Sequence, residues 1–201
     1  MKILIISPPR CGSTSLILSI RDITKYHIIN EPYYIESVRK VYPLVIPNNS
    51  VVKMLSNQVP TEFGKPTDFI KYILSIKNDY DKIILLNRRN KKQHLESWAN
   101  WLVRYKRNDD THMIWYSDDI EKELNQVSYD MDLKYQVNSI YNISDKLSIP
   151  ITFYEDLYGD DRELSLNIIK QWKLGIDELQ LNELLNPRNK YRQVGTRENL
   201  I

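Results

Sequence analysis

Several short stretches of the chain are apolar throughout and rich in β-branched residues. The first covers residues 2–7 and is stopped by Pro8 and Pro9. Because a strand that is covered on both faces carries no alternating polar residues, this pattern predicts a buried strand. Stretches of the same kind predict further strands at residues 27–29, 51–55, 83–86 and 149–154.

Between these stretches, apolar residues recur at the spacing of one face of a helix. The first example spans residues 13–23, with Ser13 or Thr14 as a natural N-cap and an apolar face formed by Leu16, Ile17, Ile20 and Ile23. Similar patterns predict helices at about 67–77, 92–106, 118–147 and 161–172. Strands that alternate with helices indicate a three-layer α/β fold, in which a central, mainly parallel sheet is covered by helices on both faces.

Composition limits the classes of protein that fit this pattern. A chain of 201 residues is most simply one domain, at 1–201. Its 28 basic and 26 acidic residues give a formal charge of +2, which argues against a nucleic acid or a membrane surface as the partner. The single cysteine, Cys11, favours a reducing compartment, and the apolar run at 3–6 is too short for a signal peptide, so we expect a cytoplasmic protein. Its oligomeric state has no signal in the sequence.

The first predicted strand leads into SPPRCGSTS, residues 7–15, at a place where an anion would bind. Ligands of open α/β sheets bind at the carboxyl ends of the strands. Gly12 allows a tight turn, Arg10 adds a positive charge, and the helix dipole favours an anion beside the N–H groups of Ser13, Thr14 and Ser15. An ordinary strand-to-helix turn is the alternative. The order of strand, prolines, arginine, glycine and hydroxyl residues favours anion binding, although the lysine of a nucleoside-triphosphate P-loop is missing.

A second group of polar residues follows the predicted strand at 83–86. In Mg²⁺-dependent NTPases a later strand commonly ends in an aspartate that helps to hold the metal. Here the strand is followed by Asn87, Arg88 and Arg89, and Ser97 lies two turns into the next helix. Basic residues at this edge suit a second anionic group, which Arg89 and Ser97 could share. A solvated basic turn is the alternative.

These two segments together resemble the motifs of the sulfotransferases that use 3′-phosphoadenosine 5′-phosphosulfate (PAPS). PPRCGST, at 8–14, is similar to the 5′-phosphosulfate-binding loop of that family. RNKKQHLES, at 89–97, matches its 3′-phosphate motif, in which an arginine precedes a serine by eight residues; Arg89 and Ser97 have this spacing, and Arg88 does not. VVKML and YEDL resemble further segments, so the likeness runs from about residue 2 to 157. The chain resembles the bacterial carbohydrate sulfotransferases of the trehalose-sulfating type more than the longer cytosolic steroid and phenol enzymes.

The resemblance implies a P-loop-type domain with PAPS as co-substrate and no metal, because the transferred sulfuryl group carries less charge than a terminal phosphoryl group. Arg10 is then expected to steady the bridging oxygen of the leaving phosphate. The 5′-phosphate is expected to lie against the loop residues Cys11, Gly12, Ser13, Thr14 and Ser15. Arg89 and Ser97 are expected to bind the 3′-phosphate and so to distinguish this donor from ATP. Cys11 departs from the commoner serine, which removes a hydroxyl but leaves the backbone cradle.

Two residues are candidates for the transfer chemistry. Sulfotransferases of the resembled group often carry a catalytic glutamate in a Glu-Pro pair after the second strand, and here the pair is Glu31 and Pro32. We expect the proline to make Glu31 extended, so that its carboxylate can accept the acceptor's proton; a turn that caps the next helix is the alternative. Lys53, expected at the end of its strand, is the weaker candidate, for stabilising the sulfuryl oxygens. A solvated lysine or an ion pair is the alternative for it.

Other polar residues receive structural interpretations. Glu155 and Asp156 are adjacent at a strand end, and we expect them to form structural hydrogen bonds at the following helix. Arg192 and Arg197 belong to a basic C-terminal segment that either closes over the donor or frays. Metal-ligand spacing is lacking for the three histidines, His27, His94 and His112.

The sequence therefore predicts a sulfotransferase that moves a sulfuryl group from PAPS to a hydroxyl of a carbohydrate or another small acceptor. Two alternatives stay open. A P-loop nucleotide or small-molecule kinase is disfavoured by the missing lysine and the missing acidic strand end. A non-catalytic nucleotide-binding module would keep the loops without turnover.

Overall fold

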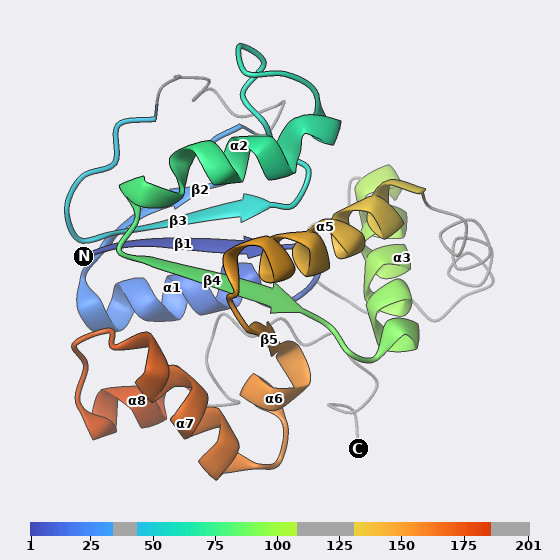
Figure 1. The fold of residues 1–201 in the computed structure, drawn as a ribbon. Coiled ribbons are helices and arrows are strands. Elements are labelled where there is room, and N and C mark those ends of the chain that lie inside the picture. Colours follow the sequence, from blue (N-terminus) through green and yellow to red (C-terminus); the bar gives the residue numbers. More distant parts are fainter. Residues whose placement is uncertain (34–43, 108–130, 186–201) are drawn as a thin grey trace.

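The computed structural model describes residues 1–33, 44–107 and 131–185, and it contains a five-stranded sheet in which every strand pairing is parallel (Figure 1). The strand order is β2-β3-β1-β4-β5. The strands are β1 (Lys2–Ser7), β2 (His27–Asn30), β3 (Ser50–Leu55), β4 (Lys82–Asn87) and β5 (Ile151–Phe153). The five predicted strands are confirmed, and the predicted mainly parallel sheet is parallel throughout its described pairings.

Helices cover both faces of this sheet. Figure 1 shows α1 (Ser13–Thr24), α7 (Arg162–Trp172) and α8 (Glu178–Leu184) on one side, and α2 (Phe69–Ile76) and α5 (Met131–Leu147) on the other. Short 3-10 turns flank α2 at Pro66–Asp68 and Lys77–Asp79, so the helix predicted at about 67–77 is α2 with these turns at its two ends. Of the helix predicted at 118–147, the part before residue 131 lies outside the described residues.

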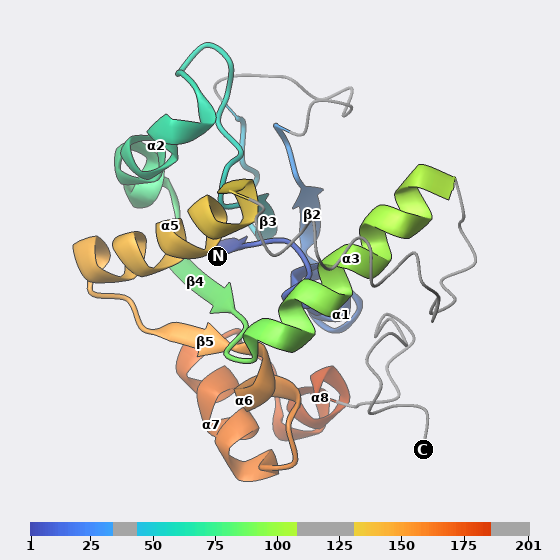
Figure 2. The same ribbon diagram turned by 90° about the vertical axis from the view of Figure 1, so that its right-hand side faces the viewer.

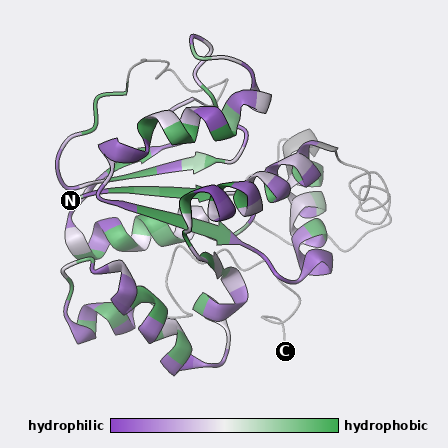
Figure 3. Ribbon diagram, viewed as in Figure 1, coloured by the Kyte–Doolittle hydropathy of each residue, from purple (hydrophilic) through white to green (hydrophobic). Residues whose placement is uncertain are grey.

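The central strand β1 divides its side chains between two apolar cores, as a strand buried on both faces must. Ile3 and Ile5 pack in one core with α1, α7 and α8, whereas Leu4 and Ile6 pack in the other with α2 and α5. The strands are accordingly coloured as hydrophobic along most of their length in Figure 3. Since the side chains on both faces of β1 are apolar, its sequence shows no alternation of apolar and polar residues and is one apolar run.

The helix α3 (Lys91–Arg107) lies beyond the carboxyl ends of the strands and runs across them in Figure 2. It packs against α5 through a separate small core of Ala99, Val103 and Leu133. This placement sets one face of α3 opposite the loop that follows β1, and that loop is the centre of the candidate site.

The structure corrects the end of the last predicted strand. A strand was expected over residues 149–154, but β5 stops at Phe153 and Tyr154 begins α6 (Tyr154–Tyr158). The reason is that Phe153 pairs with Asn87, the last residue of β4, so the parallel ladder has no partner beyond it. Glu155 and Asp156 then fall in the first turn of a helix, where acidic side chains are favoured.

The short helix α8 was not expected from the sequence. Its signal is a capping box, in which the Asp177 side chain accepts from the N–H of Gln180 and the Gln180 side chain accepts from the N–H of Asp177. Among the described residues, no helix has both the length and the hydropathy needed to cross a membrane.

Candidate functional site

The candidate site lies at the edge of the sheet where β1, β3 and β4 end, beside the first turn of α1 (Figure 2). Since all paired strands are parallel, their carboxyl ends share this edge, which is where ligands of open α/β sheets bind. The chain leaves β1 at Ser7, passes through residues 8–12 and enters α1 at Ser13. The loop identified in the sequence is therefore in the expected place.

The loop turns tightly because two of its residues have a left-handed backbone. Arg10 has φ 63° and Gly12 has φ 74°. Gly12, and not Ser13 or Thr14, is the N-cap of α1, and no side chain caps this helix end. The predicted hydroxyl cap is therefore wrong, because those hydroxyls are engaged elsewhere: Ser13 Oγ accepts a hydrogen bond of 2.8 Å from Ser7 Oγ.

The helix start offers backbone donors in place of a side-chain cap. The first intrahelical hydrogen bond runs from the N–H of Leu16 to the carbonyl of Gly12, at 3.0 Å. The N–H groups of Ser13, Thr14 and Ser15 precede it, and amides in this position have no intrahelical acceptor. With the positive end of the helix dipole, they form a group of donors suited to an anion.

Gly12 also permits close packing under the loop. A Cβ atom at this position would lie 2.8 Å from both Cδ2 and Cε2 of the Tyr154 ring. The ring is itself held, because the guanidinium of Arg88 stacks over it with 4.2 Å between Cζ and the ring centroid. Position 12 therefore requires glycine for two reasons, its positive φ and the neighbouring ring.

Lys53 and Glu31 meet next to the first turn of α1. The ammonium of Lys53 contacts Glu31 Oε1 and donates to Thr14 Oγ1 at 3.1 Å. The other carboxylate oxygen of Glu31 accepts from Gln58 Nε2 at 3.2 Å. The structure thus brings three predicted site residues into one polar chain: Glu31, directly after β2, Lys53 of β3 and Thr14 of α1.

Lys53 is buried, and it is therefore not the solvated lysine that was one alternative for this residue. Its side chain is 3% exposed, and that of Glu31 is 21% exposed. Burial lowers the pKa of Lys53, and the Glu31 carboxylate opposes this shift. Lys53 lies inside β3, two residues before its end at Leu55, which corrects the expected strand-end position.

The backbone of Glu31 is not extended, contrary to the expectation from Pro32. Its φ is 49°, in the left-handed region. The N–H of Glu31 donates to the carbonyl of Lys53 at 2.8 Å, and the side chain is held by Lys53 and Gln58. These tertiary contacts outweigh the local preference of a residue that precedes proline.

Arg10 reaches from the loop to α3. Its Nε donates to Ser97 Oγ at 3.3 Å, across 87 positions of sequence. Arg10 and Lys53 are close enough that the guanidinium contributes to the lowering of the Lys53 pKa. Two cationic side chains therefore lie near the start of α1.

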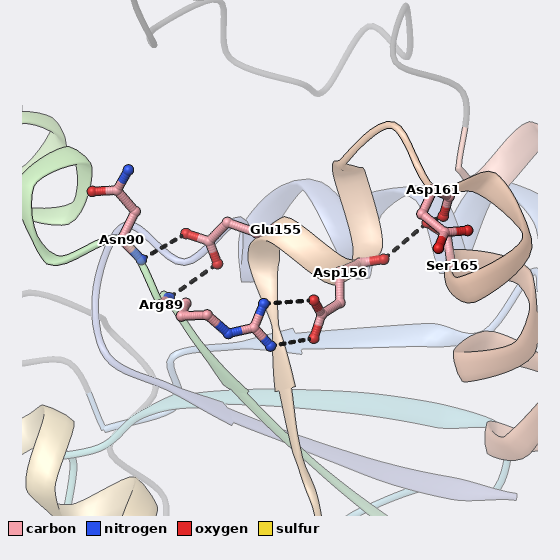
Figure 4. A network of polar contacts seen from close by, with 6 residues as sticks. All are labelled: Arg89, Asn90, Glu155, Asp156, Asp161 and Ser165. Carbon is pink, nitrogen blue, oxygen red and sulfur yellow. Dashed lines mark hydrogen bonds and ion pairs between the residues drawn. The ribbon is translucent and has the colours of Figure 1, made fainter.

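Arg89 lies in the turn between β4 and α3, and its side chain contacts β5 and α6. Its side chain is 58% exposed, and its guanidinium donates to both carboxylate oxygens of Asp156, at 2.8 Å each (Figure 4). It also stacks over Phe153, with 4.3 Å between Cζ and the ring centroid. The structure therefore brings Ser97 to Arg10, and it shows no contact between Arg89 and Ser97 among the described interactions.

Glu155 holds the same turn through its backbone. Its two carboxylate oxygens accept from the N–H groups of Arg89 and Asn90, at 3.0 and 3.1 Å (Figure 4). The structural interpretation of Glu155 and Asp156 is confirmed, although their side chains bind the turn before α3. The backbone carbonyl of Asp156 binds the following helix, where Ser165 Oγ donates to it at 2.9 Å.

Two buried donors at the end of β4 lack acceptors. Asn87 is fully buried and Arg88 is 6% exposed. Within the described residues, Asn87 Nδ2 and Arg88 Nε have no hydrogen-bond partner, while Arg88 Nη1 donates to the carbonyl of Gln93 at 3.1 Å. Buried donors are rarely left without an acceptor in folded proteins, so an anion or a water at this edge would satisfy them.

His94 also belongs to the site, although no sequence motif pointed to it. It is 4% exposed, its Nε2 lies 2.7 Å from the carbonyl of Pro9, and it is 3.8 Å from Cys11 Sγ. The available signal was its position three residues before Ser97, which puts both polar side chains on one face of α3. Sequence alone did not indicate that this face is buried against the loop.

Two predicted site residues belong to the C-terminal segment. Arg192 and Arg197 lie outside the described residues. Within residues 1–33, 44–107 and 131–185, no group of three or more His, Cys, Asp or Glu side chains is arranged to hold a metal ion.

No protein-family model matches the chain, and a search of the curated proteins likewise found no match.

Proposed function

We propose that this protein is a PAPS-dependent sulfotransferase built on a P-loop-type fold. The observation that carries the proposal is the polar chain of Thr14, Lys53 and Glu31, which joins the anion-binding helix start to a partly exposed carboxylate. A group-transfer enzyme needs a place for the leaving anion and a proton acceptor beside it. Here the anion-binding helix start follows β1, the carboxylate follows β2, and Lys53 on β3, the strand between them, joins the two.

The donor's 5′-phosphate is assigned to the start of α1. The N–H groups of the first turn and the side chain of Arg10 supply hydrogen bonds and positive charge there. Negative charge develops on the bridging oxygen as the bond from sulfur to that oxygen breaks. Arg10 stabilises this charge, and the product that leaves is adenosine 3′,5′-bisphosphate.

Glu31 is assigned as the general base. The acceptor hydroxyl attacks sulfur, its proton passes to the Glu31 carboxylate, and the new bond gives a sulfate ester. Lys53 holds this carboxylate in place and supplies positive charge to the sulfuryl oxygens. The acceptor is a carbohydrate or another small molecule that carries a hydroxyl group.

The 3′-phosphate is assigned to Arg89 and Ser97. Arg89 already presents both of its terminal nitrogens to a carboxylate, and a phosphate offers the same bidentate geometry. Binding of the donor therefore involves exchange of Asp156 for phosphate at Arg89. The unpartnered donors of Asn87 and Arg88 lie at the same strand end and favour an anionic ligand.

The proposal is tested by mixing the protein with isotopically labelled PAPS and a panel of hydroxyl acceptors, without added metal. Mass spectrometry should detect an acceptor that has gained one sulfuryl group, together with adenosine 3′,5′-bisphosphate. Calorimetry should show tighter binding of this bisphosphate than of AMP. Turnover of ATP that depends on Mg²⁺, with no sulfuryl adduct, would instead identify a kinase.

A further inference from the structure

The underside of the loop after β1 is attached to α3 by one buried histidine. We propose that His94 is a positioning residue, which fixes the Pro9–Arg10 backbone through the Pro9 carbonyl and so shapes the anion-binding loop without touching the donor. This inference rests on the proposed function for its role in the reaction. Its structural part, that His94 holds the loop closed, can be tested on the protein without a ligand.

The contact itself is specific. Nε2 of His94 lies 2.7 Å from the carbonyl oxygen of Pro9, and because a carbonyl only accepts, Nε2 carries the hydrogen and donates it. Pro9 and His94 are both buried, so neither group can replace this bond with water. The thiol of Cys11 also donates to the Pro9 carbonyl, at 3.7 Å.

The ionisation state of His94 suits this role. Burial lowers its pKa to about 4, with further lowering by Arg88 and Arg10. The Pro9 carbonyl and the Glu155 carboxylate act in the opposite direction. The imidazole is therefore neutral at neutral pH, and it holds the loop without adding a buried charge.

The position of the bond explains why it matters for the loop. Pro9 precedes Arg10, whose φ of 63° is costly for a residue with a side chain. Arg10 then reaches Ser97 on the same helix that carries His94. One face of α3 thus holds the loop at two points, the backbone at His94 and the side chain at Ser97, and Arg10 is presented between them.

Cys11 provides a readout that needs no ligand. It is the only cysteine of the chain, it is 1% exposed, and burial raises the pKa of its thiol to about 12. A thiol in this state reacts slowly with alkylating reagents, and it becomes reactive when the loop opens. The rate of its reaction with iodoacetamide therefore reports how firmly the loop is held.

The experiment compares His94→Leu and His94→Asn with His94→Gln. The Gln amide can reach the Pro9 carbonyl in place of Nε2, whereas the shorter Asn amide cannot and Leu has no donor. We expect Cys11 to react at least about tenfold faster in the Leu and Asn variants, because each loses one buried hydrogen bond that holds the loop. In the Gln variant it should react at near the native rate. Affinity for adenosine 3′,5′-bisphosphate should follow the same order.

Val103→Ala is the matched control, because Val103 is also buried on α3 but packs in the small core with Ala99 and Leu133. It should lower the thermal midpoint without the excess reactivity of Cys11. Equal reactivity in Val103→Ala and His94→Asn, or failure of the Gln variant to restore the slow rate, would overturn the inference. If Cys11 follows the expected order while even the native protein binds no bisphosphate, the positioning of the loop stands and the proposed donor is wrong.

Discussion

Arg89 and Asp156 form a bidentate ion pair across the turn that joins β4 to α3, with both N···O distances at 2.8 Å. The pair is partly solvated, because the Arg89 side chain is 58% exposed and that of Asp156 is 20% exposed. Exposed ion pairs contribute about 0–1 kcal/mol to stability. Arg89 is therefore available to exchange Asp156 for a phosphate at low cost.

The first prediction follows for Arg89→Ala. This variant should bind adenosine 3′,5′-bisphosphate about tenfold to a hundredfold more weakly than the native protein, while AMP affinity and the thermal midpoint change little. Arg88→Ala is the neighbouring comparison: because Arg88 is buried over the Tyr154 ring, this variant should lower the thermal midpoint, which Arg89→Ala leaves nearly unchanged. Calorimetry with both nucleotides decides between them. Equal weakening of both nucleotides by Arg89→Ala would rule out its role at the 3′-phosphate.

The second prediction concerns Glu31→Gln. An amide keeps the shape of the carboxylate but cannot take up the acceptor's proton, so kcat should fall by about 10² to 10⁴ while donor affinity stays nearly unchanged. Single-turnover transfer of labelled sulfuryl group measures this step directly. Glu163→Gln, on the exposed side of α7, should leave the rate at the native value. Unimpaired transfer in Glu31→Gln would exclude Glu31 as the base.

The third prediction separates the two constraints on Gly12. Gly12→Ala places a side chain at φ 74° and its Cβ 2.8 Å from the Tyr154 ring, and Gly175→Ala places one at φ 71° with no atom within 4 Å. The left-handed backbone alone costs roughly 1–2 kcal/mol for a residue with a Cβ. Denaturant unfolding should therefore show Gly175→Ala destabilised by about this amount and Gly12→Ala by more. Equal losses would mean that the Tyr154 ring moves aside freely.

The fourth prediction is a pH dependence that originates in His94. Its folded-state pKa of about 4 lies below the ordinary value of 6.5, so between these values the unfolded chain binds a proton that the folded chain does not. The neutral His94 side chain therefore contributes to the free energy of unfolding, and this contribution is fully present above pH 6.5. As the pH falls toward 4, about 3 kcal/mol of it is lost. Other acidic groups titrate in the same range.

The comparison with His94→Gln removes that complication. The variant keeps every other titrating group, so the difference between the two unfolding curves at pH 7.5 and pH 4 isolates the imidazole. Native protein should lose more stability on acidification than the variant does. Parallel curves for the two proteins would show that His94 is not buried in the neutral form.

The sequence by itself determined the layers of this protein and the location of its loop. Strands buried on both faces leave a continuous apolar run, and amphipathic helices leave a repeat of three to four residues, so both are visible over short distances along the chain. Arg10, Gly12 and the hydroxyl residues after them are neighbours in sequence. Their place at the carboxyl end of β1 follows from the strand that precedes them.

Tertiary structure alone decided which of the polar residues meet. Ser97 accepts a hydrogen bond from Arg10, which is 87 positions away in the sequence. His94 contacts Pro9 across 85 positions, and Asp156 pairs with Arg89 across 67 positions. The same is true of the backbone of Glu31, whose left-handed φ departs from the preference set by Pro32. The first three contacts depend on how α3 and α6 pack at the sheet edge, and the conformation of Glu31 depends on its contacts with Lys53 and Gln58. Packing between distant segments leaves no periodic trace in the sequence, because it selects single side chains and not a repeating face.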